Sequence, residues 1–211
     1  FAPFLFLSPA IVFFCCFILF PLIGAFGYSL ITWDFFTKPK FVGLDNYGKL
    51  FKDPLALEAI KNTFIFTLAS IVTHVGLGLI LALAVNRKIS KFFSYIIRTV
   101  FFFPFLLSWA AASLIWNFGL DPTFGVIDHY AGKLGFPQAT LLSSTWAMPT
   151  LIMIDLWKTL GFAFIVILAG IQAIPNDVNE AARVDGASGW RLFWSITFPL
   201  CTPAIFFVSV T

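Results

Sequence analysis

Charged residues are scarce in this chain. Asp, Glu, Lys and Arg make up 11 % of its 211 residues, whereas 60 % of the residues are hydrophobic. Soluble globular domains carry about 25 % charged residues, so the composition excludes an ordinary soluble domain. Uncharged stretches cover residues 1–33, 62–86 and 99–120. Because about 20 predominantly apolar residues cross the hydrocarbon core of a bilayer, we predict a multi-pass membrane protein.

The apolar stretches predict an all-α, polytopic helical fold with four complete membrane spans and the start of a fifth. The expected complete spans are residues 4–30, 58–85, 96–118 and 146–174, and the fifth is expected to begin near Phe198. The third span is predicted to run through Pro104 as one helix. Pro9 and Pro21 are expected to kink the first span, which is tolerable where neighbouring helices satisfy the carbonyl groups that a proline frees.

Neither end of the chain reads as a natural terminus. Phe1 is not an initiator Met, and Thr211 falls inside an apolar stretch. We therefore expect residues 1–211 to be a fragment of a longer protein with six or more spans, forming a single transmembrane domain.

Cysteine and histidine are rare too, with three and two copies. No cluster of His, Cys or carboxylate residues has metal-ligand spacing, and no nucleophile–base pair is evident. The basic residues are scattered rather than arranged in a stripe, which argues against a nucleic-acid partner. We expect no catalytic residue, no metal site and no bound cofactor. His74 stands alone in an apolar span and is expected either to make an interhelical hydrogen bond or to line a pathway.

Residues 43–50 come close to a phosphate-binding loop but do not complete one. Gly43, Gly48 and Lys49 have the required spacing, whereas Leu50 stands where a Ser or Thr would bind magnesium. Apolar membrane sequence surrounds the segment instead of a strand and a helix. Nucleotide binding is therefore excluded here, and any energy source must lie on another chain.

Residues 175–198 form a polar, helix-forming segment between two apolar stretches. Asn176 or Asp177 is expected to cap a first short helix, and Gly186 suits a left-handed conformation at its end. Ser188 is expected to cap a second short helix. A compact polar helix held between two spans is well placed to meet another protein.

The residue pattern of this segment resembles a known sequence motif. Glu180, Ala181 and Ala182 are followed after three residues by Gly186 and later by Ile196 and Pro199. This pattern is similar to the cytoplasmic EAA loop of permease subunits in binding-protein-dependent ABC importers, with Phe198 in place of the usual Leu. Asp185 and Ala187 complete an Asp-Gly-Ala form that looks like the carbohydrate-uptake class (the maltose and glycerol-phosphate type). Residues 168–175 and 41–47 are similar to the same class.

The resemblance implies a mechanism. Residues 175–198 would form a coupling loop that docks on a cytoplasmic ATPase, and the residues implicated are Glu180, Ala181, Ala182, Asp185, Gly186 and Ala187. The Ala181–Ala182 face would allow close approach, and Glu180 would make a polar contact. Asp185 would either contact the ATPase or organise the corner. Movement of the closing ATPase dimer would then switch the pathway between inward and outward states.

The resemblance also implies partners and a place. The chain would pair with a second homologous permease, an ABC ATPase dimer that uses ATP and Mg²⁺, an extracytoplasmic solute-binding protein and membrane lipid. It would lie in a bacterial or archaeal inner membrane and form half of a pathway for a sugar or sugar derivative. Other cargoes that remain open are glycerol phosphate, a polyol, a peptide or a polyamine. More distant alternatives are a membrane-embedded enzyme and a channel.

Charge alone does not orient the chain, because Lys and Arg number six in the loops on each side. The resemblance places residues 175–198 in the cytoplasm and Asn46 outside.

Asp155 and Lys158 are ionisable residues inside the fourth span, which makes them functional candidates. Their three-residue spacing puts them on one helix face, where they are expected to neutralise each other. They form either a structural pair or, with Trp157, part of the substrate pathway. An aromatic face beside polar groups suits a sugar, which presents apolar C–H patches as well as hydroxyls.

Overall fold

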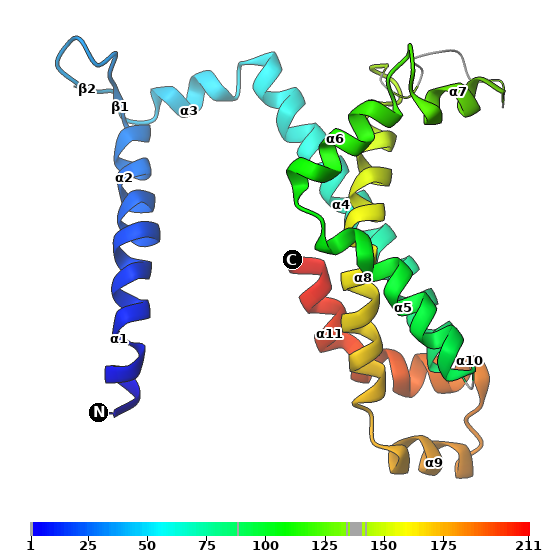
Figure 1. The fold of residues 1–211 in the computed structure, drawn as a ribbon. Coiled ribbons are helices and arrows are strands. Elements are labelled where there is room, and N and C mark those ends of the chain that lie inside the picture. Colours follow the sequence, from blue (N-terminus) through cyan, green and yellow to red (C-terminus); the bar gives the residue numbers. More distant parts are fainter. Residues whose placement is uncertain (1, 88, 134, 136–140, 142) are drawn as a thin grey trace. The chain divides into compact units, whose positions relative to one another are not determined.

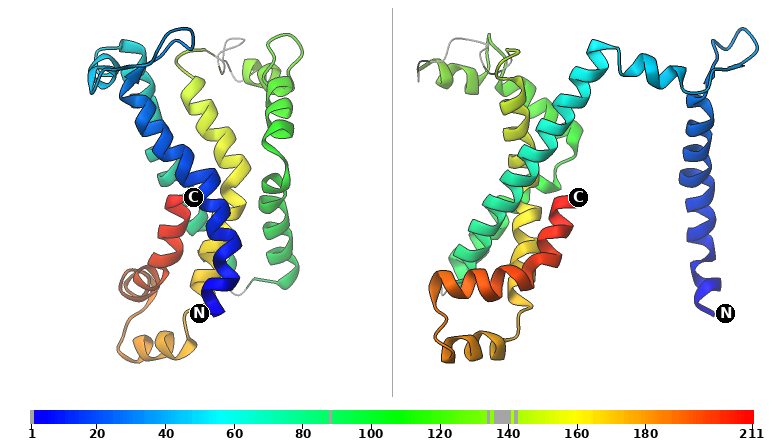
Figure 2. Two further views of the ribbon diagram at one scale, coloured as in Figure 1. Left: turned by 90° about the vertical axis from the view of Figure 1, so that its left-hand side faces the viewer. Right: turned by 180° about the vertical axis from the view of Figure 1, so that it is seen from behind.

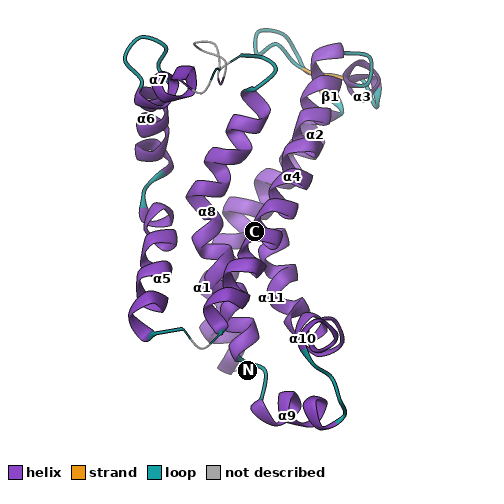
Figure 3. Cartoon of the chain, turned by 90° about the vertical axis from the view of Figure 1, so that its right-hand side faces the viewer, coloured by secondary structure: helices purple, strands orange, loops and turns teal. Residues whose placement is uncertain are grey.

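The computed structural model describes residues 2–87, 89–133, 135, 141 and 143–211. Within these residues the secondary structure is helical apart from two strands of two residues each, and loops connect the elements (Figures 1 and 3). Its contacts divide it into two compact units, Phe1–Thr63 and Phe64–Thr211. Lys88 of the second polar loop lies outside the described residues.

The first unit contains the predicted first span. Helices α1 (Ala2–Phe14) and α2 (Phe20–Ser29) are joined by a π-helical segment, η1 (Cys15–Leu19). Together they provide a candidate span of 26 residues, Phe4–Ser29, and confirm the predicted one.

The segment after this span is tied back to the end of α2. Strands β1 (Ile31–Thr32) and β2 (Lys40–Phe41) pair antiparallel, and the short helix α3 (Asp45–Leu50) follows. The side-chain amide of Asn46 donates to the carbonyl oxygens of Ser29 and Ile31, at 2.9 Å each. The Ser29 carbonyl group is among the last of α2, which have no partner within the helix.

The second and fourth predicted spans are confirmed, and the fifth is longer than expected. Helix α4 (Pro54–Asn86) has 33 residues and α8 (Ala147–Gln172) has 26. The last span was expected to begin near Phe198, but its helix begins nine residues earlier and covers Gly189–Val210. It comprises α10 (Gly189–Leu192), the π-helical segment η3 (Phe193–Thr197) and α11 (Phe198–Val210). In Figure 2 its first half crosses the end of the bundle, and α11 then turns along α8.

The third predicted span is not a continuous helix. Helices α5 (Lys91–Leu106) and α6 (Trp109–Gly119) meet at an angle of 97°. Pro104 cannot donate a backbone hydrogen bond, and Leu107 and Ser108 adopt extended conformations. The Ser108 hydroxyl oxygen accepts from the backbone N–H of Ala111 at 3.1 Å, which begins a new helix instead of continuing the old one. The short helix α7 (Val126–Lys133) follows α6.

Each of the two π-helical segments in the described chain ends two residues before a proline. The N–H of Phe20 bonds to the carbonyl oxygen of Cys15, and the N–H of Phe198 bonds to that of Phe193, five residues back in each case. Pro21 and Pro199 are the next residues. A proline ring clashes with the carbonyl group four residues back, and one extra residue in the turn relieves that clash without ending the helix.

Helix α8 is the centre of the second unit. Its residues Ala163, Phe164, Ile167, Leu168 and Ile171 contribute half of the main buried cluster, which also takes in Ala82 and Val85 of α4 and Cys201 and Val208 of α11. Gly161 is buried where α8 crosses α5, so closely that a Cβ there would overlap the carbonyl group of Phe101. Gly170 likewise allows close approach of Ala204 in α11. Small residues at such crossings are typical of packing between membrane helices.

A methyl group at Gly161 tests this packing. Gly161→Ala is expected to lower the stability of the purified subunit by about 1–3 kcal/mol, because the α5 backbone must move away. The measurement is thermal unfolding in detergent. Gly76→Ala is the matched control, since nothing lies within 4 Å of a Cβ at that position of α4. An unchanged melting temperature for Gly161→Ala would contradict the backbone contact.

Candidate functional site

The polar segment forms a short helix at one end of the bundle. Helix α9 (Asn176–Val184) lies between α8 and α10 (Figure 1). It ends as predicted: Gly186 has φ +81°, its N–H bonds to the Arg183 carbonyl oxygen, and the Ala187 N–H bonds to the Ala182 carbonyl oxygen. These two bonds define a Schellman motif, which turns the chain sharply back.

The expected side-chain caps are absent from this segment. Pro175 occupies the N-cap position of α9, so Asn176 and Asp177 already lie inside the helix. From there their side chains are not placed to accept from the N–H groups of the second and third helical residues, as a capping side chain does. Ser188 stands at the N-cap of α10, but its side chain makes no capping bond.

Helix α9 has an inner and an outer face. Val178 packs against the main buried cluster, and Ala182 is only 8 % exposed. Ala182 is therefore covered by its own chain, contrary to the expectation that it shares a docking face with Ala181. Ala181, Glu180 and Asp185 are exposed, and Val184 is 87 % exposed. Among the described residues, no charged side chain of this segment forms an ion pair.

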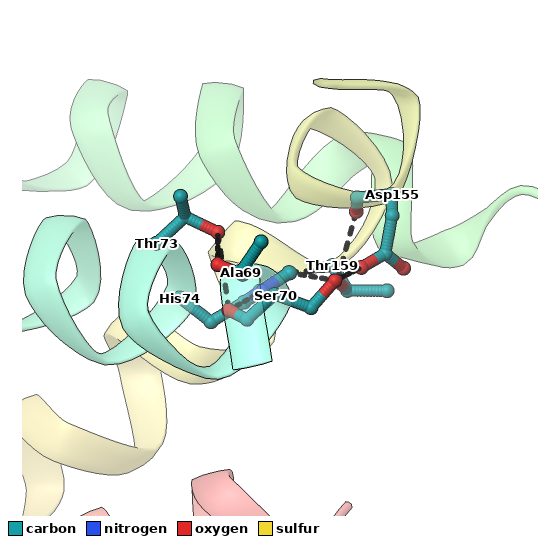
Figure 4. A network of polar contacts seen from close by, with 6 residues as sticks. All are labelled: Ala69, Ser70, Thr73, His74, Asp155 and Thr159. Atoms are coloured by element: carbon teal, nitrogen blue, oxygen red, sulfur yellow. Dashed lines mark hydrogen bonds and ion pairs between the residues drawn. The ribbon is translucent and has the colours of Figure 1, made fainter. Parts of the chain in front are cut away.

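A second candidate site is a polar network between α4 and α8 (Figure 4). The Ser70 hydroxyl donates to Oδ2 of Asp155 at 2.9 Å, and Nε2 of His74 lies 3.9 Å from the same oxygen. His74 Nε2 also lies 2.5 Å from the Thr159 hydroxyl oxygen, which bears out its expected interhelical hydrogen bond. The network therefore joins the two helices and leaves the other carboxylate oxygen of Asp155 available.

The hydrogen bonds constrain the protons on His74. Its Nδ1 lies 2.7 Å from the carbonyl oxygen of Ser70, which can only accept, so Nδ1 carries a proton. The Thr159 hydroxyl has a single proton, which it donates either to the Asp155 carbonyl oxygen at 2.9 Å or to His74 Nε2. In the first case Nε2 is also protonated and His74 is cationic; in the second His74 is neutral.

This network opens on a cleft of about 560 Å³. The volume falls in the range of about 300–1,000 Å³ that is usual for small-molecule sites. Its walls combine aromatic rings with hydroxyl groups. The lining residues that matter here are Phe66, Phe105, Trp109 and Phe162 for the rings and Thr67, Ser70, Thr159 and Ser209 for the hydroxyls, with His74 and Asp155 between them.

Lys158 does not pair with Asp155 and does not line the cleft. It is 3 % exposed, and its ammonium group donates to the carbonyl oxygen of Phe105 at 2.9 Å. It also lies 5.3 Å and 5.2 Å from the ring centres of Phe105 and Trp109. The expected neutral pair is wrong because each residue has a closer partner: Lys158 satisfies a carbonyl at the α5–α6 break, and Asp155 faces α4.

Trp157 is likewise turned away from the cleft. Its ring packs edge to face on Trp116 of α6, with the ring centres 5.4 Å apart. Of the three residues expected along a substrate pathway, only Asp155 lines the cleft. Ser70 and Thr159 were not expected at all, although polar residues at positions i and i+4 of two apolar spans were a usable signal.

A smaller hollow of about 360 Å³ is lined by α7 and the segment just before it, with Thr123, His129 and Tyr130 among the lining residues. Beside it, the hydroxyl and backbone N–H of Thr123 donate to Asp121 and lower the pKa of that carboxyl group. Within the described part of the chain, no three His, Cys, Asp or Glu side chains are grouped to hold a metal ion.

Comparison with known proteins identifies the family. Residues 74–211 match the family described as the binding-protein-dependent transport system inner membrane component. The chain belongs to this family. It is therefore an inner-membrane permease subunit of a binding-protein-dependent ABC importer, a transport component rather than an enzyme.

Relatives of this permease match almost its whole length. It is 36 % identical to the probable ABC transporter permease YurN of Bacillus subtilis, over 99 % of this chain and 72 % of that protein. It is 34 % identical to the sn-glycerol-3-phosphate permease UgpA of Rhizobium meliloti, over 99 % of this chain and 71 % of that protein. A chain of a bacterial ABC transporter involved in the import of the acidic polysaccharide alginate has a similar structure, with a TM-score of 0.79 and 29 % identity. The match covers 99 % of this chain and 71 % of that chain.

Replacement of Lys158 tests its role at the helix break. Lys158→Met is expected to destabilise the subunit by about 1–3 kcal/mol, because the Phe105 carbonyl group loses its donor. Lys133→Met is the control: Lys133 is exposed, with its ammonium group 5.1 Å from the ring centre of Tyr130, and its loss is expected to cost at most about 0.5 kcal/mol. Equal thermal unfolding of the two variants would show that the Lys158 bond adds no stability.

Proposed function

We propose that this permease subunit receives the movement of a cytoplasmic ATPase through α9 and carries a carbohydrate along the cleft between α4 and α8. The observation that supports the coupling role most directly is the outer face of α9. This face exposes Glu180, Ala181 and Val184, leaves its charges without ion pairs in the described structure, and lies between two spans.

The local geometry explains how such docking would move the spans. The inner face of α9 is held by Val178, which packs against the main buried cluster, and that cluster includes residues of α8 and α11. The Schellman motif at Gly186 makes the connection to α10 short and sharply turned. A displacement of α9 therefore reaches both spans as a rigid-body movement, which is how a bistable packing interface is switched.

The cleft supports the cargo part of the proposal. A sugar ring has apolar C–H faces that pack on aromatic rings and hydroxyls that need hydrogen-bond partners. Phe105, Trp109 and Phe162 supply the rings, and Asp155 and Thr159 supply polar partners. A second permease would complete the pathway, and an extracytoplasmic binding protein would deliver the cargo.

Substitution of Gly186 tests the coupling role. Gly186→Val is expected to reduce cargo uptake about tenfold, because a β-branched residue in the left-handed conformation costs about 1–2 kcal/mol and shifts the corner. The measurements are uptake and cargo-stimulated ATP hydrolysis by the assembled importer in proteoliposomes. Both should fall together while the amount of subunit in the membrane stays constant.

Gly186→Asn is the matched control. Asn adopts the left-handed conformation readily, and a Cβ at this position has nothing within 4 Å. This variant should therefore keep most of the uptake. Undiminished uptake by Gly186→Val at equal subunit levels would count against coupling through this corner.

A further inference from the structure

The charge of the cleft points to the kind of carbohydrate that it takes. The only ionisable side chains among its described lining residues are His74 and Asp155. The side chain of Asp155 is 19 % exposed, and among the residues that the structure describes it receives one hydroxyl donor, that of Ser70. An ionised carboxylate has two oxygens and about four acceptor positions, so Asp155 can accept further hydrogen bonds from a ligand.

Lys158 would be the natural counter-charge, and it is withdrawn from the cleft. Its ammonium group is committed to the Phe105 carbonyl oxygen and lies near the rings of Phe105 and Trp109. At 3 % exposure it cannot reach a ligand. The Asp155 carboxylate therefore lines the cleft, whereas the Lys158 ammonium group lies outside it, against the rings of Phe105 and Trp109.

His74 does not supply a free cation either. When it is neutral, the cleft carries the net negative charge of Asp155. When it is protonated, its charge 3.9 Å from Asp155 offsets that of the carboxylate, so the cleft still carries no net positive charge that would attract an anion. Both N–H groups of the protonated ring are then already used, one by the Ser70 carbonyl oxygen and the other by the Thr159 hydroxyl oxygen. In neither state does it offer a donor to an anionic ligand.

We infer that the cargo of this cleft is an uncharged carbohydrate, whose hydroxyls donate to Asp155 and whose apolar faces pack on Trp109 and the neighbouring phenylalanines. This inference rests on the proposed function. A phosphate or a uronate would bring its negative charge beside the Asp155 carboxylate, where like charges repel, and no net positive charge of the lining residues offsets that repulsion. An uncharged cargo differs from those named for two similar transporters, glycerol 3-phosphate and the acidic polysaccharide alginate, both of which are anionic.

The test uses matched ligands that differ only in charge. The full-length permease is assembled with its partner permease and ATPases, without the binding protein, so that binding reports on the membrane subunits alone. Methyl glycosides of glucose, galactose and mannose are each compared with the uronate in which the C6 hydroxymethyl group is a carboxylate. Isothermal titration in detergent is expected to show, for at least one pair, that the neutral sugar binds more than about tenfold tighter.

Three variants separate charge from shape. Asp155→Asn keeps the size of the side chain and removes its charge, so the preference for the neutral sugar should fall to about threefold or less. Ser70→Ala removes the hydroxyl donor and keeps the carboxylate, so the preference should remain. Asp177→Asn removes the same charge from α9, outside the cleft, and should leave the preference unchanged.

Tighter or equal binding of the uronates by the unmodified complex would overturn the inference, as would a preference that survives in Asp155→Asn. Binding of no pair by a complex that still imports would also overturn it, because recognition would then lie elsewhere. These outcomes differ from a failure of the proposed function, in which the complete importer, binding protein included, would take up no carbohydrate at all.

Discussion

Close packing against α8 is the interaction on which the surrounding elements depend. Gly161 lets the backbone of α5 lie against that of α8, and this contact brings the α5–α6 break level with Lys158. A broken helix inside a membrane leaves backbone carbonyl groups that water cannot satisfy. The Lys158 ammonium group satisfies one of them, so the glycine contact and the buried cation together make a 97° bend tenable.

The same helix separates two charges that are three residues apart. Asp155 faces α4, where Ser70 and His74 meet it, and Lys158 reaches the other way to the Phe105 carbonyl oxygen. Spacing along one helix therefore does not make an ion pair when each side chain has a partner on a different neighbour. One consequence is structural, a supported break in a span. The other is functional, a cleft in which a carboxylate stands without a free cation.

Helix α9 depends on α8 in a different way. On its inner side Ala182 is buried and Val178 is half-buried against their own chain, which leaves Glu180, Ala181 and Val184 outside. From the sequence pattern alone, Ala181 and Ala182 were predicted to share one docking face. Neighbouring residues of a helix point about 100° apart, so they seldom share a docking face once a tertiary contact claims one of them.

Composition alone identified a membrane protein, because uncharged apolar stretches long enough to cross a bilayer are typical of membrane spans. The residue pattern from Glu180 to Pro199 indicated the family. The turn at Gly186 could also be predicted from the sequence, since few residues other than glycine adopt a left-handed conformation readily. Tertiary structure alone decided the bend after Pro104, the separation of Asp155 from Lys158, and the meeting of Ser70 with Asp155 across 85 residues. Local sequence reports what one helix prefers, whereas a hydrogen bond between helices depends on which of them pack together.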